Sequence, residues 1–156
     1  MIVLVMGVSG SGKTTIGERL AARLGARFLD ADDFHPPQNV AKMAAGVPLT
    51  DEDRSPWLTR LNEALRGERN AVLACSALKE KYRKTLREGV ADFRIAHLKG
   101  SYDFIHARLA ARRHRYMPAS LLASQFATLE PPADAIEVDV TQDVDACVAK
   151  IAEALG

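Results

Sequence analysis

The chain has 156 residues, of which 47% are hydrophobic, and its 21 basic and 20 acidic side chains give a formal net charge of +1. This length predicts one domain over residues 1–156, and the near-zero charge excludes the broad basic surface that binds nucleic acid or membranes. Because Cys75 and Cys147 form no metal-binding or disulfide pattern, and the short apolar start lacks the basic flank of a signal peptide, we expect a cytoplasmic protein.

The first predicted element is a buried strand at residues 2–6, which runs directly into a glycine-rich loop. Residues 7–14 read Gly-Val-Ser-Gly-Ser-Gly-Lys-Thr and match the phosphate-binding pattern G-x-x-x-x-G-K-[ST]. The strand before it and the helix-periodic stretch after it argue against a turn that matches by chance. We expect Lys13 to reach the β- and γ-phosphates of a nucleotide and the Thr14 hydroxyl to ligate Mg²⁺. The predicted nucleotide-binding residues are Gly7, Val8, Ser9, Gly10, Ser11, Gly12, Lys13, Thr14 and Thr15.

The second predicted strand spans residues 27–29, and three carboxylates, Asp30, Asp32 and Asp33, follow it. If the chain stays extended, Asp30 and Asp32 project to the same side and face one phosphate site. Asp32 is then the candidate that orients and deprotonates an attacking hydroxyl, and Asp30 lies nearer the Mg²⁺ shell. The alternative is a solvated acidic turn, which suits Asp33 best.

Two segments interrupt the alternation of strands and helices, residues 32–56 and residues 107–132. Both contain prolines, and both are predicted to lie over the carboxyl edge of the sheet. Ligands of open parallel sheets bind at that edge. We therefore expect the first insertion to bind an acceptor substrate and the second to form a mobile lid.

An acceptor that is an anion needs positive groups around it, and three candidates, His35, Lys42 and Arg54, fall in the first insertion. Arg54 is suited to grip a carboxylate through two parallel hydrogen bonds, with Asp51, Asp53 and Trp57 holding it in place. The alternative is that Arg54 only pairs with one of these two acids on the first turn of a helix. His35 precedes a proline, so its backbone is expected to be extended and its ring to face the cleft, although a purely structural histidine remains an equal alternative.

The third predicted strand, residues 71–75, ends without a carboxylate. Ser76, Lys79 and Arg83 follow at its carboxyl end and on the first turns of the next helix. This position predicts that they contact the acceptor.

The second insertion begins with a run of arginines in which Arg108 and Arg112 share one helix face. Like charges at this spacing repel one another, so an anion that completes the site explains them. Arginines on a closing lid would stabilise the charge on a transferred phosphoryl group. The alternatives are a basic surface helix or a nucleic-acid patch, and the net charge argues against the patch.

Strands predicted at residues 93–98 and 135–138 complete an alternation of five strands with helix-length segments. The predicted fold class is α/β, a three-layer P-loop NTPase fold with a parallel five-stranded sheet flanked by helices. Residues 139–143 are a candidate for the adenine site by position alone.

With these residues in order, the chain resembles the gluconate kinases of the small P-loop type, relatives of shikimate kinase and adenylate kinase. The segments that carry the resemblance are residues 6–14, 30–36 (DADDFHP), 39–43 (NVAKM), 48–58 (PLTDEDRSPWL), 75–79 (CSALK) with Tyr82 and Arg83, and 117–131. It implies a nucleoside-monophosphate-kinase-like fold with a helical lid, ATP and Mg²⁺ as cofactors, and phosphorylation of D-gluconate at the 6-hydroxyl. It also implies a homodimer and places Gln125 among the acceptor-binding residues. One departure is Arg115-Tyr116, where the family often has His-Phe.

Two other functions stay open. One is a kinase for another small anionic polyol, such as shikimate. The other is a nucleotide switch without an acceptor, which the absence of an Asn-Lys-x-Asp guanine-reading motif disfavours.

Overall fold

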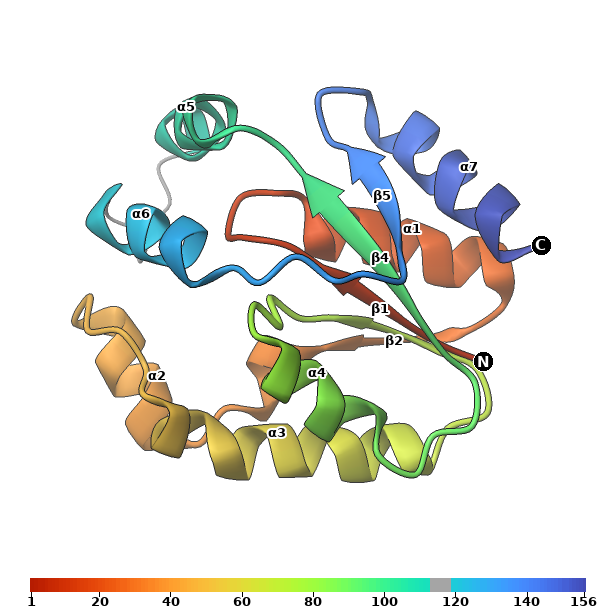
Figure 1. Ribbon diagram of the computed structural model, residues 1–156, viewed down its shortest axis with the longest axis horizontal. Helices are drawn as coiled ribbons and strands as arrows, with labels where there is room; N and C mark the ends of the chain where they lie inside the picture. Colours follow the sequence, from red (N-terminus) through yellow and green to blue (C-terminus); the bar gives the residue numbers. More distant parts are fainter. Residues whose placement is uncertain (113–118) are drawn as a thin grey trace.

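The computed structural model describes residues 1–112 and 119–156, with the side chains of residues 112 and 119 excepted. A parallel five-stranded sheet runs through its centre in the order β2-β3-β1-β4-β5, which confirms the predicted sheet (Figure 1). The strands are β1 (Ile2–Met6), β2 (Arg27–Asp30), β3 (Ala71–Ala74), β4 (Phe93–Lys99) and β5 (Ala135–Asp139). Three strands end one residue later than predicted and β3 ends one earlier, because the pairs Asp30–Ala74 and Lys99–Asp139 close the ladders.

Helices cover both faces of the sheet (Figure 1). One face carries α1 (Lys13–Leu24) and α7 (Val144–Leu155), and the other carries α3 (Asp51–Arg66) and α4 (Glu80–Arg87). The remaining helices, α2 (Pro37–Ala44), α5 (Tyr102–Arg112) and α6 (Ala119–Thr128), lie beyond the carboxyl ends of the strands. No helix in the described part of the chain is long and apolar enough to span a bilayer.

Alternation along β1 builds two cores, one on each face of the sheet. Val3 and Val5 point into the core beneath α1 and α7, whereas Leu4 and Met6 point into the core beneath α3 and α4. All four side chains are essentially inaccessible to solvent. β1 is therefore buried on both faces, as is usual for a central strand of a parallel sheet, and the glycine-rich loop follows directly from it.

Local sequence signals fix the ends of two helices that frame the site. Gly12 precedes α1 with φ 98°, and Gly25 ends it with φ 64°, both in the left-handed region that glycine favours. A capping box starts α3, in which Thr50 Oγ1 accepts the Asp53 N–H and the Asp53 carboxylate accepts the Thr50 N–H. These ends place Lys13 and Arg54 at the first turns of their helices.

Candidate active site

The glycine-rich loop connects β1 to α1 at the carboxyl edge of the sheet. Gly10 has φ 82°, and a Cβ there would come within 2.7 Å of the Leu109 side chain on α5, so the loop packs too closely for a larger residue. Lys13 Nζ donates to the carbonyl of Val8 at 3.0 Å and so lies across the loop. Burial lowers the pKa of Lys13, and the negative charge of Asp32 opposes that shift.

Thr14 and Asp30 form a pair of oxygen donors beside the loop. The Thr14 hydroxyl donates to Asp30 Oδ2 at 3.3 Å, and Asp30 Oδ1 accepts the backbone N–H of Asp32 at 3.0 Å. Burial raises the pKa of Asp30. The chain is therefore not extended here: residues Ala31–Phe34 form a 3₁₀ turn that Asp30 caps. The expectation of an extended Asp30–Asp32 segment is wrong, because the side chain of Asp30 bonds its own backbone two residues on.

A cavity of about 630 Å³ lies next to the loop and collects most of the predicted acceptor residues. The 3₁₀ turn, α2, the start of α3, the end of β3 and α6 surround it. Its polar lining comprises Ser9, Asp32, His35, Thr50, Asp51, Arg54, Ser76, Lys79, Ser124, Gln125 and Thr128. Ser9 belongs to the loop, so the cavity and the phosphate-binding loop are contiguous.

Asp32 and His35 face each other at the wall of this cavity. The Asp32 side chain is 82% exposed, whereas that of His35 is 3% exposed, and Asp32 Oδ1 lies 4.0 Å from His35 Nε2. The His35 ring stacks on Trp57 with centroids 4.1 Å apart, and the indole N–H donates to the carbonyl of Ala31 at 2.7 Å. Burial, assisted by the charge of Arg54, lowers the pKa of His35 to about 4. His35 is therefore neutral at physiological pH, so the expectation of a positive group at this position is wrong.

Arg54 is held by partners other than those expected. Its NH1 group donates to the carbonyl of Leu49 at 2.6 Å and to the hydroxyl of Tyr82 at 3.2 Å, and its Cζ lies 5.3 Å from the centre of the Tyr82 ring. Asp51 and Asp53 bond to other groups, so the expectation that they hold Arg54 is wrong. The reason is that their side chains face lysines and the helix cap, while Arg54 turns toward α4.

Two of the three acids in the first turn of α3, Asp51 and Asp53, each pair with a predicted acceptor-binding lysine. Lys42 Nζ lies 2.7 Å from Asp53 and lowers the pKa of that carboxyl to about 2. Lys79 Nζ lies 3.3 Å from Asp51, which also bonds Lys81 and the Tyr82 hydroxyl, and these groups hold the pKa of Asp51 well below its usual range. Lys79 lines the cavity, whereas Lys42 lies outside its lining.

Arg83 lies apart from the cavity. It is 1% exposed, and its NH1 and NH2 groups donate to the carbonyls of Ala77 and Glu130, each at 2.7 Å. Its Nε and NH2 groups also contact Glu80 Oε2. Arg83 thus ties the start of α4 to the segment that follows α6, and Ser76 and Lys79 reach the cavity without it.

Two side chains from the second insertion contact the loop. Arg108 donates to the carbonyls of Gly10 and Ser11 at 3.5 and 3.4 Å and to the carbonyl of Val140 at 3.0 Å. Gln125 bonds both the backbone N–H and the hydroxyl of Ser9. The predicted role of the Arg112 side chain, and the Arg115-Tyr116 departure, fall outside the described part of the chain.

Asn39 and Tyr82 hold the site but were not among the predicted site residues, and Trp57, which was expected to hold Arg54, stacks on His35 instead. Asn39 follows His35 by four positions and bonds its ring, a spacing that a local search for ring partners would have found. Trp57 and Tyr82 act through contacts with Ala31 and Arg54, which lie far from them in the sequence.

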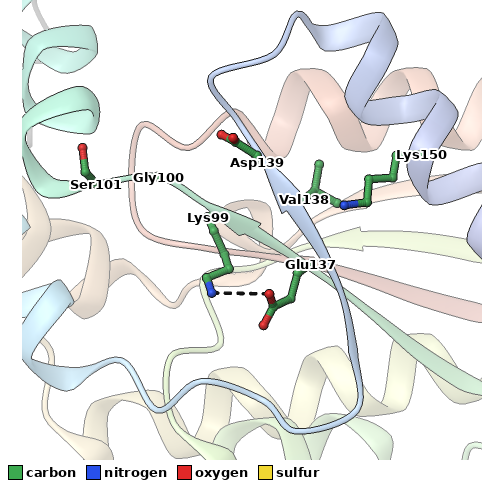
Figure 2. A pocket seen from close by; sticks show the side chains of 7 residues that line it. All are labelled: Lys99, Gly100, Ser101, Glu137, Val138, Asp139 and Lys150. Carbon is green, nitrogen blue, oxygen red and sulfur yellow. Dashed lines mark ion pairs between the residues drawn. The ribbon is translucent and has the colours of Figure 1, made fainter.

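A second hollow, of about 500 Å³, opens at the carboxyl ends of β4 and β5 (Figure 2). Two of its lining residues, Lys99 and Glu137, form an ion pair of 3.5 Å. Asp139, the first residue of the candidate adenine segment, lies at its rim. Val140, the next residue, does not line this hollow, and its carbonyl accepts the bond from Arg108 described above.

The parallel sheet, the loop ahead of α1 and the polar cavity beside it together define a P-loop phosphotransferase. A family model described as an AAA domain matches residues 2–132. The chain is 44% identical to the probable gluconokinase of Xenopus tropicalis over 97% of this chain and 91% of that protein. It is 45% identical to the thermosensitive gluconokinase of Escherichia coli over 90% of this chain and 80% of that protein. The chain belongs to the gluconokinase family.

Solved structures agree with this assignment. The crystal structure of a gluconokinase from Sinorhizobium meliloti superposes with a TM-score of 0.89 at 41% identity, covering 98% of this chain and 94% of the other.

Proposed function

We propose that the protein transfers the γ-phosphoryl group of ATP to the 6-hydroxyl of D-gluconate, giving 6-phospho-D-gluconate and ADP. The observation that carries this proposal is that Asp32, Arg54 and Ser9 of the phosphate-binding loop line the same cavity. A sugar acid offers a carboxylate to Arg54 and a terminal hydroxyl to Asp32. The names of the relatives given above support the same acceptor.

The loop fits ATP and Mg²⁺. Gly10 and Gly12 adopt the left-handed conformations that let a loop wrap a phosphate, and the start of α1 adds its positive end. Thr14 and Asp30 supply hard oxygen atoms, and no cluster of three metal-binding side chains occurs in the described residues. This suits Mg²⁺, which keeps several waters and phosphate oxygens as ligands. When bound, the ion would screen the charge of the β- and γ-phosphates.

Different residues of the chain then perform the separate steps of the transfer. Arg54 binds the carboxylate of the acceptor, and Asp32 accepts the proton of the hydroxyl as its oxygen attacks the γ-phosphorus. The bond from that phosphorus to the bridging oxygen of ADP breaks, and Lys13 and Arg108 stabilise the charge on the moving group. We assign the same stabilising role to Arg112. The acceptor is positioned by Ser76, Lys79 and Gln125, which line the cavity, and by Lys42, which acts through its pair with Asp53. Arg83 supports the cavity lining from outside.

We further propose a cytoplasmic homodimer, which the resemblance to the family supports. Light scattering coupled to size-exclusion chromatography tests the assembly, and a monomer at enzyme concentrations used in assays would contradict it.

An acceptor panel tests the activity. Protein, ATP and Mg²⁺ are mixed with D-gluconate, other aldonic acids, shikimate, a nucleoside monophosphate or no acceptor, and ADP release is followed. Gluconate should give the highest kcat/KM, and NMR of the product should show a phosphate on O6. Turnover of shikimate or the nucleotide with gluconate inert, or fast ATP hydrolysis without any acceptor, would refute the proposal.

A further inference from the structure

Asn39 is a buried polar residue to which the proposed chemistry assigns no role. It lies on α2 and is 1% exposed. Its Nδ2 atom lies 2.9 Å from the carbonyl oxygen of Asp53 and 3.2 Å from Nδ1 of His35. Its Oδ1 atom is buried and has no hydrogen-bond partner among the described residues.

These contacts determine which way the amide points. A backbone carbonyl only accepts hydrogen bonds, so the amide nitrogen of Asn39, and not its oxygen, must face Asp53. The second hydrogen of the same amide then points at His35 Nδ1, which must accept it. A neutral imidazole that accepts at Nδ1 carries its proton on Nε2.

The ring of His35 is also fixed in direction. It stacks on Trp57, whose indole N–H is bonded to the carbonyl of Ala31, so a ring flip would break the Asn39 contact while keeping the stack. In the observed orientation Nε2 faces Asp32 Oδ1 at 4.0 Å. The charge of Arg54, from α3, also acts on the ring and lowers its pKa.

The distance of 4.0 Å is too long for a direct hydrogen bond, but it suits a shared ligand atom. One hydroxyl oxygen can lie about 2.8 Å from both groups, because two such contacts span any separation up to about 5.6 Å. That hydroxyl would donate its proton to Asp32 and accept from His35 Nε2. Because Asp32 fixes the proton of the hydroxyl and His35 fixes one lone pair of its oxygen, the direction of the remaining lone pair, which attacks phosphorus, is also fixed.

We propose that Asn39 is a positioning residue: it holds His35 as an Nε2–H donor, so that His35 and Asp32 together orient the acceptor hydroxyl for attack. This inference rests on the proposed function for the identity of the acceptor, but the tautomer of His35 does not depend on it. Protonation of His35 would give Nδ1 a hydrogen that opposes the Asn39 amide, so the contact also favours the neutral ring, as burial does.

Imidazole ¹⁵N NMR tests the tautomer in the full-length protein without any substrate, with the His35 signals assigned by their loss in His35→Gln. We expect an unprotonated Nδ1 and a protonated Nε2 from pH 8 to pH 5. Asn39→Leu should give a mixture of tautomers and a higher pKa for His35. If that variant does not fold, Asn39→Asp serves instead, and it should move the proton to Nδ1 because a carboxylate only accepts. A proton on Nδ1 in the unmodified protein would overturn the inference.

Kinetics test the consequence. Asn39→Leu should lower kcat for gluconate about 10- to 100-fold and leave the KM for ATP unchanged, because only the orientation of the hydroxyl is lost. The matched control is Asn62→Leu, since Asn62 is also buried and donates to two carbonyls, those of Leu86 and Glu88, away from the cavity. It should lose stability but keep kcat. Equal losses of kcat in both variants would overturn the inference, whereas the expected tautomer without any turnover of gluconate would refute only the proposed function.

Discussion

Gln125 on α6 holds Ser9 of the phosphate-binding loop by two hydrogen bonds. Its Oε1 accepts the Ser9 N–H at 2.7 Å, and its Nε2 donates to the Ser9 hydroxyl at 3.0 Å. The two residues are 116 positions apart, and both line the 630 Å³ cavity beside the loop. The loop and α6 are therefore connected where the phosphate-binding loop meets this cavity.

Gln125→Glu should weaken ATP binding. The carboxylate still accepts the Ser9 N–H, but it cannot donate to the hydroxyl and places a negative charge beside the loop that binds phosphates. We expect the KM for ATP to rise about 10-fold, a loss near 1.4 kcal/mol, measured by steady-state kinetics and calorimetry. Gln38→Glu, an exposed change of the same charge outside the cavity lining, is the control. An unchanged affinity for ATP in Gln125→Glu would count against this interpretation.

Asp32→Asn should abolish most of the turnover. The amide has nearly the same shape but cannot take the proton of the acceptor, so kcat should fall by about 10²- to 10⁴-fold while ATP still binds. Asp33→Asn, next to it on the same 3₁₀ turn, changes the net charge equally and should keep kcat. The two variants are compared by rapid-quench assays and nucleotide titration. Comparable rates for both would end the assignment of Asp32 as base.

Arg54→Lys should affect the acceptor more than the nucleotide. Lysine keeps the charge but loses the planar fork, and with it the shared contacts to Leu49 and Tyr82. The KM for gluconate should rise about 10- to 100-fold with little change for ATP. Arg66→Lys at the far end of the same helix is the matched control. A parallel rise in both KM values would indicate a general structural defect.

His35 should make the protein less stable in mild acid. Its pKa is lowered from 6.5 to about 4, so between these values the unfolded chain binds a proton that the folded protein does not. Stability is lost as the pH falls through this window, by about 2 kcal/mol at pH 5. His35→Gln should therefore lose less free energy of unfolding between pH 7 and pH 5 than the unmodified protein.

Urea unfolding at the two pH values measures this difference. The pKa of the Asp53 carboxyl is lowered to about 2, so its effect on the free energy of unfolding is lost mainly below pH 5. It therefore does not disturb the comparison between pH 7 and pH 5. His106→Gln, at an exposed histidine, controls for the loss of an imidazole. An identical pH dependence in the unmodified protein and His35→Gln would refute the prediction.

The sheet and the loop were predictable because their signals are local. Apolar runs, glycines and the Gly-Lys-Thr end of the loop are read within a few residues. The 3₁₀ turn at Asp30 was also readable locally, since an aspartate that bonds the backbone two residues on is a common turn signal, but the expectation of a continuing strand obscured it.

The partners of the cations were not predictable in the same way. Arg54 bonds Tyr82, 28 positions away, and Arg83 bonds the carbonyl of Glu130, 47 positions away. Such pairs depend on how α3 and α4 pack on the sheet and where the chain returns after α6. A pattern within one segment shows that a cation is present, but it does not show whether a ligand or another part of the protein satisfies it.

Glu130, to which the buried Arg83 is bonded, connects the start of α4 to the chain that follows α6. Its N–H donates to the carbonyl of Leu78 at 2.8 Å, its carbonyl accepts from Arg83, and its carboxylate accepts the N–H of Glu80 at 2.8 Å. α6 ends two residues before Glu130, and Gln125 within it bonds Ser9, so the helix is held both just beyond its end and at the phosphate-binding loop. Hydrogen bonds thus run without a break from α4 through Glu130 and α6 to the loop, which makes these distant segments one connected unit.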